Sequence, residues 1–238
     1  MKNFKIALFA YNFPHRKTND FIKVIYKNHF KISVIIAADF VEIKSPKSVF
    51  RFQKYDVKET LMGLAERYMI PIVVAPHNSE KTKNALKQYS INLGVISGAR
   101  ILSQEVILLI KYGILNFHPG LLPYVRGLDS VLWSIDKDFH IGVTAHLISN
   151  KIDSGTLVLK KKINVHSVDN LESLYEKNYQ LQLQLMPISL NLVFKNTKFN
   201  VFSKDGVYNK KMTYTQQLKL VNKIDNYIQK YSTLNEKN

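Results

Sequence analysis

The chain has 238 residues, of which 46% are hydrophobic and 22% are charged, a composition that excludes a mostly disordered protein. It contains no cysteine, which excludes disulfides, cysteine-ligated zinc and a thiol nucleophile. No apolar run approaches the roughly 18–20 residues that cross a bilayer, and residues 1–10 read as a first strand rather than a secretory leader. We therefore expect a cytoplasmic protein without a membrane partner.

The net charge is +16, from 34 Lys and Arg against 18 Asp and Glu. The surplus is uneven: residues 1–100 carry 17 basic and 7 acidic side chains, residues 101–194 carry 8 of each, and residues 195–238 carry 9 and 3. A positive field attracts nucleic acid, anionic lipid or phosphorylated small molecules, although a lysine-rich solvated surface explains the charge equally well. We expect the chemistry in the neutral middle of the chain.

Short β-branched apolar runs alternate with helical patterns over the first two-thirds of the chain. Four runs predict strands that are buried on both faces: 6–10, 32–37, 71–75 and 93–97. Apolar residues at helical spacing, the last set behind a Ser103 cap, predict helices over 19–30, 58–69, 79–89 and 103–110. This alternation implies right-handed βαβ crossovers. The predicted fold class is α/β, with a Rossmann-like, mostly parallel sheet and helices on both faces.

The later part of the chain predicts a closing region and an extension. Further strands are expected over 114–118, 142–148 and 156–159, and a long helix is expected over 171–192. Residues 199–202 and 206–208 flank a turn and predict a hairpin, and 215–231 predicts a basic terminal helix. We therefore expect a catalytic domain over residues 1–195 and a small hairpin-and-helix extension over residues 196–238.

Several common site motifs are missing from the sequence. Residues 10–16, after the first strand, hold no Gly-rich loop, so a dinucleotide fingerprint or a P-loop is unsupported. No Ser lies in a nucleophile elbow. Histidines stand at positions 15, 29, 77, 118, 140, 146 and 166, without metal-ligand spacing. We expect no metal, and we expect a structural role for His146, which alternates with apolar neighbours on a strand.

Three polar residues form the strongest candidate site. Asn116 and His118 are two apart on a strand, so both side chains face one way at its carboxyl end, where open α/β sheets place their ligands. Asp153 stands on a tight turn between two later strands. An amide, an imidazole and a carboxylate suit acyl transfer to an amine, because they can stabilise an oxyanion and remove protons. From spacing alone, a purely structural turn is the alternative.

The same residues resemble a known family. The resemblance is carried by 116–123 (Asn-Phe-His-Pro-Gly-Leu-Leu-Pro), Arg126-Gly127, Trp133, 142–144 (Gly-Val-Thr) and 152–155 (Ile-Asp-Ser-Gly). These motifs are similar to the signature of the folate-dependent formyltransferases, which include glycinamide ribonucleotide formyltransferase, methionyl-tRNA formyltransferase and the sugar N-formyltransferases. The similarity is specific over residues 93–160 and weak elsewhere. It departs from the family at Gly120, where a Ser is usual.

The resemblance implies roles for individual residues. The family's catalytic triad falls on Asn116, His118 and Asp153. The family's donor, 10-formyltetrahydrofolate, would be the co-substrate, with no metal involved. Residues 98–103 match the segment whose backbone receives the pterin ring, so Arg100, Ile101 and Leu102 are the expected donor-binding residues.

Differences between this chain and individual members of the family indicate which acceptor to expect. The glycinamide enzyme has a Gly-rich phosphate loop where this chain has Asn12-Phe-Pro-His15, and the methionyl-tRNA enzyme carries a β-barrel domain that the residues after Leu192 are too few to build. Sugar N-formyltransferases commonly add a small extension. We expect a nucleotide-linked amino deoxysugar, foremost a dTDP-4-amino-4,6-dideoxyhexose used for surface polysaccharide or O-antigen. The alternatives are a methionyl-tRNA formyltransferase-like enzyme and a basic nucleic-acid binder with a degenerate core.

Substrate contacts are expected from basic and aromatic side chains. Asn12, Arg126 and Tyr208 are the expected substrate-binding residues, with Tyr208 stacking a nucleobase unless it is an ordinary surface tyrosine. Cations that could meet a pyrophosphate are Arg16, Lys17, Arg100 and Arg126. Apolar residues of 199–202 and 215–231 follow the main core, so we expect a homodimer that uses this segment.

Overall fold

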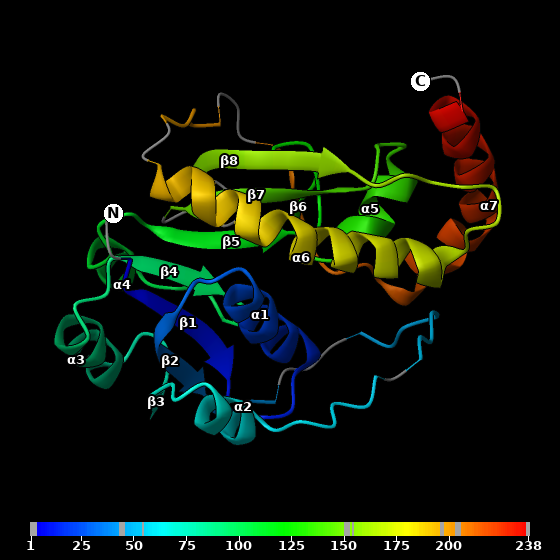
Figure 1. Cartoon of the computed structure of the whole chain (residues 1–238). Helices are drawn as coiled ribbons and strands as arrows, with labels where there is room; N and C mark the ends of the chain where they lie inside the picture. The colour runs from blue at the N-terminus through cyan, green and yellow to red at the C-terminus, as the bar shows by residue number, and fades with distance from the viewer. Residues whose placement is uncertain are drawn as a thin grey trace.

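The computed structural model describes residues 4–42, 46–53, 55–149, 153, 155–195, 198–202 and 206–236 (Figure 1). The strands of the large sheet are β1 (Ile6–Tyr11), β2 (Ile32–Ala38), β3 (Ile72–Val74), β4 (Leu93–Ile96), β5 (Ile114–His118), β7 (Gly142–Ile148) and β8 (Gly155–Lys162). Their order is β3-β2-β1-β4-β5-β7-β8. Strands β1 to β5 pair in parallel, whereas β7 is antiparallel to both β5 and β8.

The helices cover both faces of this sheet. They are α1 (Arg16–Lys27), α2 (Leu61–Arg67), α3 (Glu80–Gln88), α4 (Gln104–Leu108), α5 (Ser130–Asp136), α6 (Leu171–Phe194) and α7 (Tyr214–Glu236). One core lies between the sheet and α1, α2, α5 and α6, and a second core lies against α3 and α4. Alternate residues of β1 serve the two cores, because successive side chains of a strand point to opposite faces. The predicted fold class is confirmed.

Helix α6 closes the fold over β5, β7 and β8 (Figure 1). It begins at a capping box, in which the Asn170 side chain accepts from the Ser173 N–H and the Ser173 side chain accepts from the Asn170 N–H. Its buried Asn178 donates to the Gly142 carbonyl oxygen at 2.8 Å, which ties the helix to the start of β7. Since an unpaired buried amide is costly, this contact fixes how α6 lies on the sheet.

The expected hairpin does not form within the described residues. Val201 bridges Thr156 of β8, and β9 (Tyr208–Asn209) pairs in parallel with β6 (Arg126–Gly127), while the turn residues 203–205 lie outside the described residues. Gly127 permits the β6–β9 pairing: its φ is +91°, and a Cβ there would lie 2.1 Å from the Asn209 carbonyl oxygen. The apolar pattern predicts short strands, but it does not predict which strand each of them pairs with. Pairing is made by backbone groups, which are the same in every residue.

Helix α7 supports the segment between α5 and β7. The Tyr227 hydroxyl donates to the Phe139 carbonyl oxygen at 2.8 Å and accepts from the Ile141 N–H at 3.0 Å. The Tyr231 hydroxyl donates to the Asp138 carbonyl oxygen at 2.7 Å. In the described part of the chain, no helix combines the length and the apolar character needed to cross a membrane.

The connection between β2 and α2 is tied to the α6 and α7 helices. The Tyr55 hydroxyl donates to Glu176 of α6 at 2.5 Å, and Gln217 of α7 accepts from the Val49 N–H at 2.9 Å. The same Glu176 carboxylate receives two hydrogen bonds from Arg16 of α1, at 2.7 and 2.6 Å. Glu176 therefore joins three segments that are far apart in sequence.

Candidate active site

The site begins at the carboxyl end of β5. Asn116 and His118 lie on one face of this strand, and the β5–β7 register places His146 opposite Asn116 and Thr144 opposite His118. All four side chains therefore share one side of the sheet. The parallel strands β1 and β4 end at the same edge, as expected for a ligand site in an open α/β sheet.

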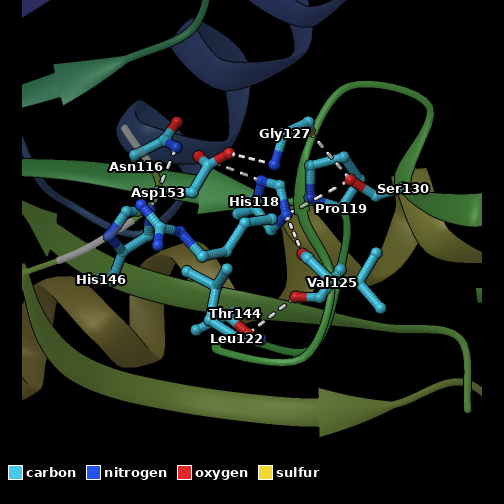
Figure 2. Close-up of polar contacts among 12 residues, drawn as sticks. Asn116, His118, Pro119, Leu122, Val125, Gly127, Ser130, Thr144, His146 and Asp153 are labelled. Carbon is cyan, nitrogen blue, oxygen red and sulfur yellow. Dashed lines mark hydrogen bonds and ion pairs between the residues drawn. The ribbon is translucent and has the colours of Figure 1, made fainter. Parts of the chain in front are cut away.

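His118 is held between two hydrogen-bond acceptors (Figure 2). Its Nδ1 lies 3.2 Å from Oδ1 of Asp153, and its Nε2 lies 2.7 Å from the Val125 carbonyl oxygen. A third neighbour, the Ser130 hydroxyl at 3.2 Å from Nε2, is itself placed to donate to the Gly127 carbonyl oxygen. Both ring nitrogens of His118 therefore face an oxygen acceptor, which fixes the orientation of the ring.

Asp153 reaches His118 from a turn with left-handed backbone. Its φ is +47°, and Gly155, two residues later, has a φ of +117°. Burial raises the pKa of the Asp153 carboxyl, but hydrogen bonds and charge from His118 and the Gly127 N–H, at 2.7 Å, outweigh burial and lower the pKa below its usual value. Asp153 is therefore a carboxylate at neutral pH, paired with the His118 ring.

Asn116 lies next to a residue whose role the sequence did not predict. Its Nδ2 donates to Nε2 of His146 at 3.2 Å, and His146 is fully buried. We expected a structural role for His146, whereas the structure places it in contact with the triad amide. The sequence shows only that His146 and Thr144 are two apart on a strand, and the register between β5 and β7 is what places His146 opposite Asn116.

Thr144 holds the loop that follows the triad. Its hydroxyl donates to the Gly120 carbonyl oxygen at 2.7 Å and accepts from the Leu122 N–H at 3.0 Å. This loop carries Val125 and leads into β6. Thr144 therefore fixes the Val125 carbonyl that contacts His118 and the Gly127 N–H that binds Asp153. The side chains of the triad are held before any ligand arrives.

A cleft of about 430 Å³ opens onto these residues. One side, here called the β5 wall, consists of Asn116, His118, Gly127 and Asp153. Another side, here called the α1 wall, consists of Tyr11, His15 and Lys17. The stretch from Ile96 to Ala99 lies between them in the sheet order, and Tyr208 of β9 completes the lining.

The α1 wall has unusual electrostatics. Burial, followed by the charge of Lys17, lowers the pKa of His15 to about 4, so its ring is neutral at pH 7. Burial alone lowers the pKa of Lys17 to about 8. The His15 ring is also within hydrogen-bond distance of the Thr18 hydroxyl, with Nδ1 and Oγ1 2.9 Å apart.

The structure separates the predicted substrate-binding residues. Tyr208 lines the cleft. Asn12 does not, and donates instead to the Asp39 carboxylate at 2.7 Å. Arg126 is buried, and its Nη1 donates to the Gly206 carbonyl oxygen at 3.0 Å, which holds the residues leading into β9.

The predicted donor-binding residues directly follow the cleft-lining stretch after β4. Leu102 is buried in the second core, Ile101 is exposed, and Arg100 Nη2 donates to the Val41 carbonyl oxygen at 3.4 Å. The backbone of this loop is fixed by Asn78, whose amide donates to the Ile101 carbonyl oxygen and accepts from the Ser103 N–H. Across the described ranges, no three His, Cys, Asp or Glu side chains gather so that they could hold a metal ion.

Chemically, the β5 wall combines a hydrogen-bond donor, an imidazole ring and a carboxylate. The Asn116 amide has a second N–H besides the one given to His146, and it can donate to an oxyanion. The Asp153–His118 pair can stabilise negative charge and take part in proton movement. This combination fits the transfer of an acyl group to a nucleophile that must lose a proton.

Comparisons with known proteins agree with this geometry. A methionyl-tRNA formyltransferase from Prochlorococcus marinus (strain MIT 9215) is 33% identical over 202 residues, which are 82% of this chain and 59% of the relative. The chain thus spans about three-fifths of that curated relative's length.

Two solved structures share the fold. Phosphoribosylglycinamide formyltransferase from Anaplasma phagocytophilum has a TM-score of 0.65 at 18% identity, over 89% of this chain and 100% of that one. The formyltransferase PseJ from Anoxybacillus kamchatkensis, in complex with UDP-4,6-dideoxy-4-formamido-L-AltNAc and tetrahydrofolate, has a TM-score of 0.60 at 19% identity, over 95% and 97%. A family model described as formyl transferase matches residues 44–190, a range that contains all three triad residues. The chain therefore belongs to the formyl transferase family.

Proposed function

We propose that the protein transfers a formyl group from 10-formyltetrahydrofolate to an amine. The observation that carries the proposal is the gathering of Asn116, His118 and Asp153 on one wall of a single cleft, with His118 and Asp153 3.2 Å apart. Each group has a task in this reaction, because the attacking amine creates an oxyanion and must lose a proton.

Asn116 would stabilise the developing charge. The amine nitrogen forms a bond to the formyl carbon, and the formyl oxygen becomes an oxyanion while the bond from carbon to the donor nitrogen is still intact. An amide N–H aimed at that oxygen is worth more in the transition state than in the ground state. His146 keeps the Asn116 amide oriented, because it accepts the other N–H.

His118 and Asp153 would manage charge and protons. A hydrogen bond from the His118 ring to the oxyanion would lower the energy of the transition state, and Asp153 keeps the ring oriented. As the bond between carbon and the donor nitrogen breaks, that nitrogen takes up a proton and the acceptor nitrogen gives one up. A His–Asp pair within reach can relay this proton, directly or through water.

We propose that the donor binds along the loop of residues 98–102. This loop follows β4, adjoins the cleft through Gly98 and Ala99, and then enters α4. Gly98 lets this loop pack closely against β1, because a Cβ there would lie 2.6 Å from the Tyr11 ring. Arg100, Ile101 and Leu102 are the proposed donor-binding residues.

For the acceptor, we propose the amine of a nucleotide-linked amino deoxysugar. Support comes from β9, which brings Tyr208 into the cleft, and from the near-complete overlap with a formyltransferase whose structure holds a UDP-linked formamido sugar. The methionyl-tRNA relative, at 33% identity, and the net charge of +16 support a second candidate, a methionyl-tRNA acceptor.

One experiment separates these acceptors. The protein is incubated with 10-formyltetrahydrofolate and, in turn, dTDP- and UDP-linked 4-amino and 3-amino sugars, glycinamide ribonucleotide and Met-tRNA, and formylated product is identified by mass spectrometry. We expect product with an amino sugar nucleotide. Product with Met-tRNA alone would overturn the sugar proposal, and absence of product with all of them would overturn the activity.

Salt dependence gives an independent measure of the same choice. Contacts to about 6–10 tRNA phosphates would lower affinity by several orders of magnitude between 50 and 200 mM salt. A sugar nucleotide has one pyrophosphate, so we expect its Michaelis constant to rise only a few-fold over that range.

We also propose a homodimer. Tyr214, Leu218 and Val221 of α7 are spaced on one helical face and expose 49%, 47% and 43% of their surface. Such an apolar stripe fits a two-fold contact. Light scattering at micromolar concentration should give twice the mass of the chain, and Leu218→Glu should return the mass of a monomer.

A further inference from the structure

The cleft contains one uncommitted cation among the described residues. Arg16 is bound to Glu176 by two hydrogen bonds and lies between the Tyr55 and Tyr179 rings. Arg126 is buried and bonded to Gly206, and Arg100 lies outside the cleft lining. Among the Lys and Arg residues that the structure describes, Lys17 is the one that lines the cleft.

The surroundings of Lys17 leave its charge uncompensated. Its Nζ lies 5.1 Å from the centre of the Phe21 ring, and none of the carboxylates of the described residues pairs with it. The other titratable groups of the cleft are Tyr11, His15, His118, Asp129, Asp153 and Tyr208. Both acids are engaged, Asp129 with the Met212 N–H and Asp153 with His118 and Gly127.

The position of Lys17 separates it from the proposed donor loop. Helix α1 lies on the sheet face covered by α2, α5 and α6, whereas residues 98–102 lead into α4 on the opposite face. The Asn116 and His118 side chains, at the carboxyl end of β5, point to the same face as Ile114, which belongs to the second core. An amine adds to a formyl carbon from above or below the plane of the formamide, so the acceptor and the donor need different parts of the cleft.

We propose that Lys17 binds the anionic group of the acceptor, a phosphate or diphosphate, and so positions the acceptor amine at Asn116. The proposal rests on the formyl-transfer function stated above, and it adds the residue that selects for anionic acceptors. His15, which is neutral at pH 7, leaves Lys17 as the charge on the α1 wall.

This role links acceptor binding to pH. The Lys17 amine, with its pKa of about 8, is charged below pH 8 and neutral above it. A bound anion favours the charged form, so binding takes up protons near and above pH 8. Affinity for a phosphorylated ligand should therefore fall as the pH rises through 8. The terminal phosphate of UDP or dTDP ionises near pH 6 and keeps its charge across this range, whereas inorganic pyrophosphate loses its last proton within it and therefore serves at pH 7.5 alone.

The binding test uses calorimetry with UDP and dTDP at pH 7.5 and 9.5, and with inorganic pyrophosphate at pH 7.5. In the wild type, we expect affinity to fall about tenfold over this range, as for loss of one charge-assisted contact. Lys17→Met should already bind weakly at pH 7.5, whereas Lys17→Arg should remain constant with pH. Lys23→Met is the matched control, because Lys23 is on the same helix and pairs with Glu59.

The kinetic test separates this role from others. Lys17→Met should raise the Michaelis constant for the acceptor about tenfold or more, with kcat and the Michaelis constant for the donor nearly unchanged. An increase confined to the donor would assign Lys17 to a folate carboxylate, and a loss confined to kcat would assign it to proton transfer. Either result overturns the proposal, as does a Lys17→Arg enzyme with the wild-type pH profile.

The anion-binding role of Lys17 and the identity of the acceptor can be disproved independently. If pyrophosphate binds in a Lys17-dependent way but no amino sugar nucleotide is formylated, the anion site stands and the acceptor assignment falls. If formylation occurs and Lys17→Met changes no acceptor constant, the function stands and the Lys17 role falls. If Lys17→Met does not fold, the pH profile of Lys17→Arg decides.

Discussion

The two walls of the cleft are built on different principles. On the β5 wall, His118 and Asp153 contact each other, and both form hydrogen bonds with backbone groups of residues 119–127. Asn116 is already hydrogen-bonded to His146. On the α1 wall, Lys17 is charged at pH 7 and lies over the Phe21 ring, and none of the described carboxylates pairs with it. The β5 wall is complete before a ligand arrives, whereas the α1 wall is completed by one.

The two walls differ because stabilising a transition state and selecting a ligand place different demands on charged groups. Groups that act on a transition state gain from being fixed in advance, since reorganisation during the reaction would raise the barrier. A group that selects a ligand is more selective when its charge is unpaired in the free protein, since a ligand of opposite charge pairs with it and other ligands do not. The predictions below test whether the two walls separate kcat from substrate affinity.

The largest effect should come from breaking the β5 wall. Asn116→Ala or Asp153→Ala should lower kcat by roughly 10²–10⁴, as the removal of an oxyanion donor or of a proton-handling partner does. Steady-state kinetics with the product-forming acceptor measure this effect. Asn28→Ala, at the far end of α1, is the control and should retain kcat. Near-wild-type turnover in either triad variant would contradict the assignment of the β5 wall.

The next effect tests whether the β5 wall depends on β9. In Gly127→Ala, the added Cβ would meet the Asn209 carbonyl oxygen, and the φ of +91° disfavours any side chain, so stability should fall by about 1–3 kcal/mol. Because the Gly127 N–H binds Asp153, kcat should fall as well.

Gly63→Ala provides the matched control for that substitution. Gly63 lies within α2, and its added Cβ would have Thr60 Oγ1 as its nearest neighbour at 3.4 Å. Alanine should stabilise the helix by about 0.5–1 kcal/mol. Urea denaturation of both variants measures the difference, and equal stabilities would show that β9 does not constrain Gly127.

A smaller effect is expected from the support behind the β5 wall. Tyr227→Phe removes the hydroxyl that serves the Phe139 carbonyl and the Ile141 N–H, so stability should fall by about 1–3 kcal/mol. Michaelis constants should remain unchanged, because Tyr227 lies outside the cleft lining. Asn226→Ala, at an exposed position on the same helix, should not lower the melting temperature. A change in acceptor affinity in Tyr227→Phe would link the two walls.

The smallest effect concerns the anchor beneath the α1 wall. The Arg16 hydrogen bond lowers the pKa of Glu176 from 4.5 to about 2. The carboxylate is needed for this contact, so its stabilisation is present above about pH 4.5 and is lost as the pH falls towards 2. Glu176→Gln should cost under about 1 kcal/mol at pH 7, since the pair is partly solvated, and should lose part of the acid dependence. Urea titrations at pH 7 and pH 3, with Glu66→Gln as control, measure this change.

Much of the fold and of the β5 wall could be predicted from the sequence. The strand and helix periods identify the sheet because they are local signals. Asn116, His118 and the turn at Asp153 stand in short motifs whose residue types already suggest their chemistry. The structure adds their mutual distances and the partner His146, which depends on the register between β5 and β7.

The rest depended on packing between distant segments. Arg16 and Lys17 are adjacent cations in the sequence, and only the placement of α6 decides that Glu176 binds the first and leaves the second to the cleft. The predicted hairpin was wrong for the same reason, since β9 finds its partner at β6. Asn12 and Arg126 were named as binding residues from their types, and their contacts with Asp39 and Gly206 draw them elsewhere.

The pairing of β9 with β6 also has a consequence for how the protein is made. The Asn209 side chain binds the Arg126 carbonyl oxygen across 83 positions of the chain, and this contact forms only when the later segment has left the ribosome. Helices and parallel strands of the first two-thirds can fold during translation, because their partners are near in sequence. The β9 strand, which carries Tyr208, must wait. The nascent protein should therefore acquire its sheet first and its complete binding cleft last.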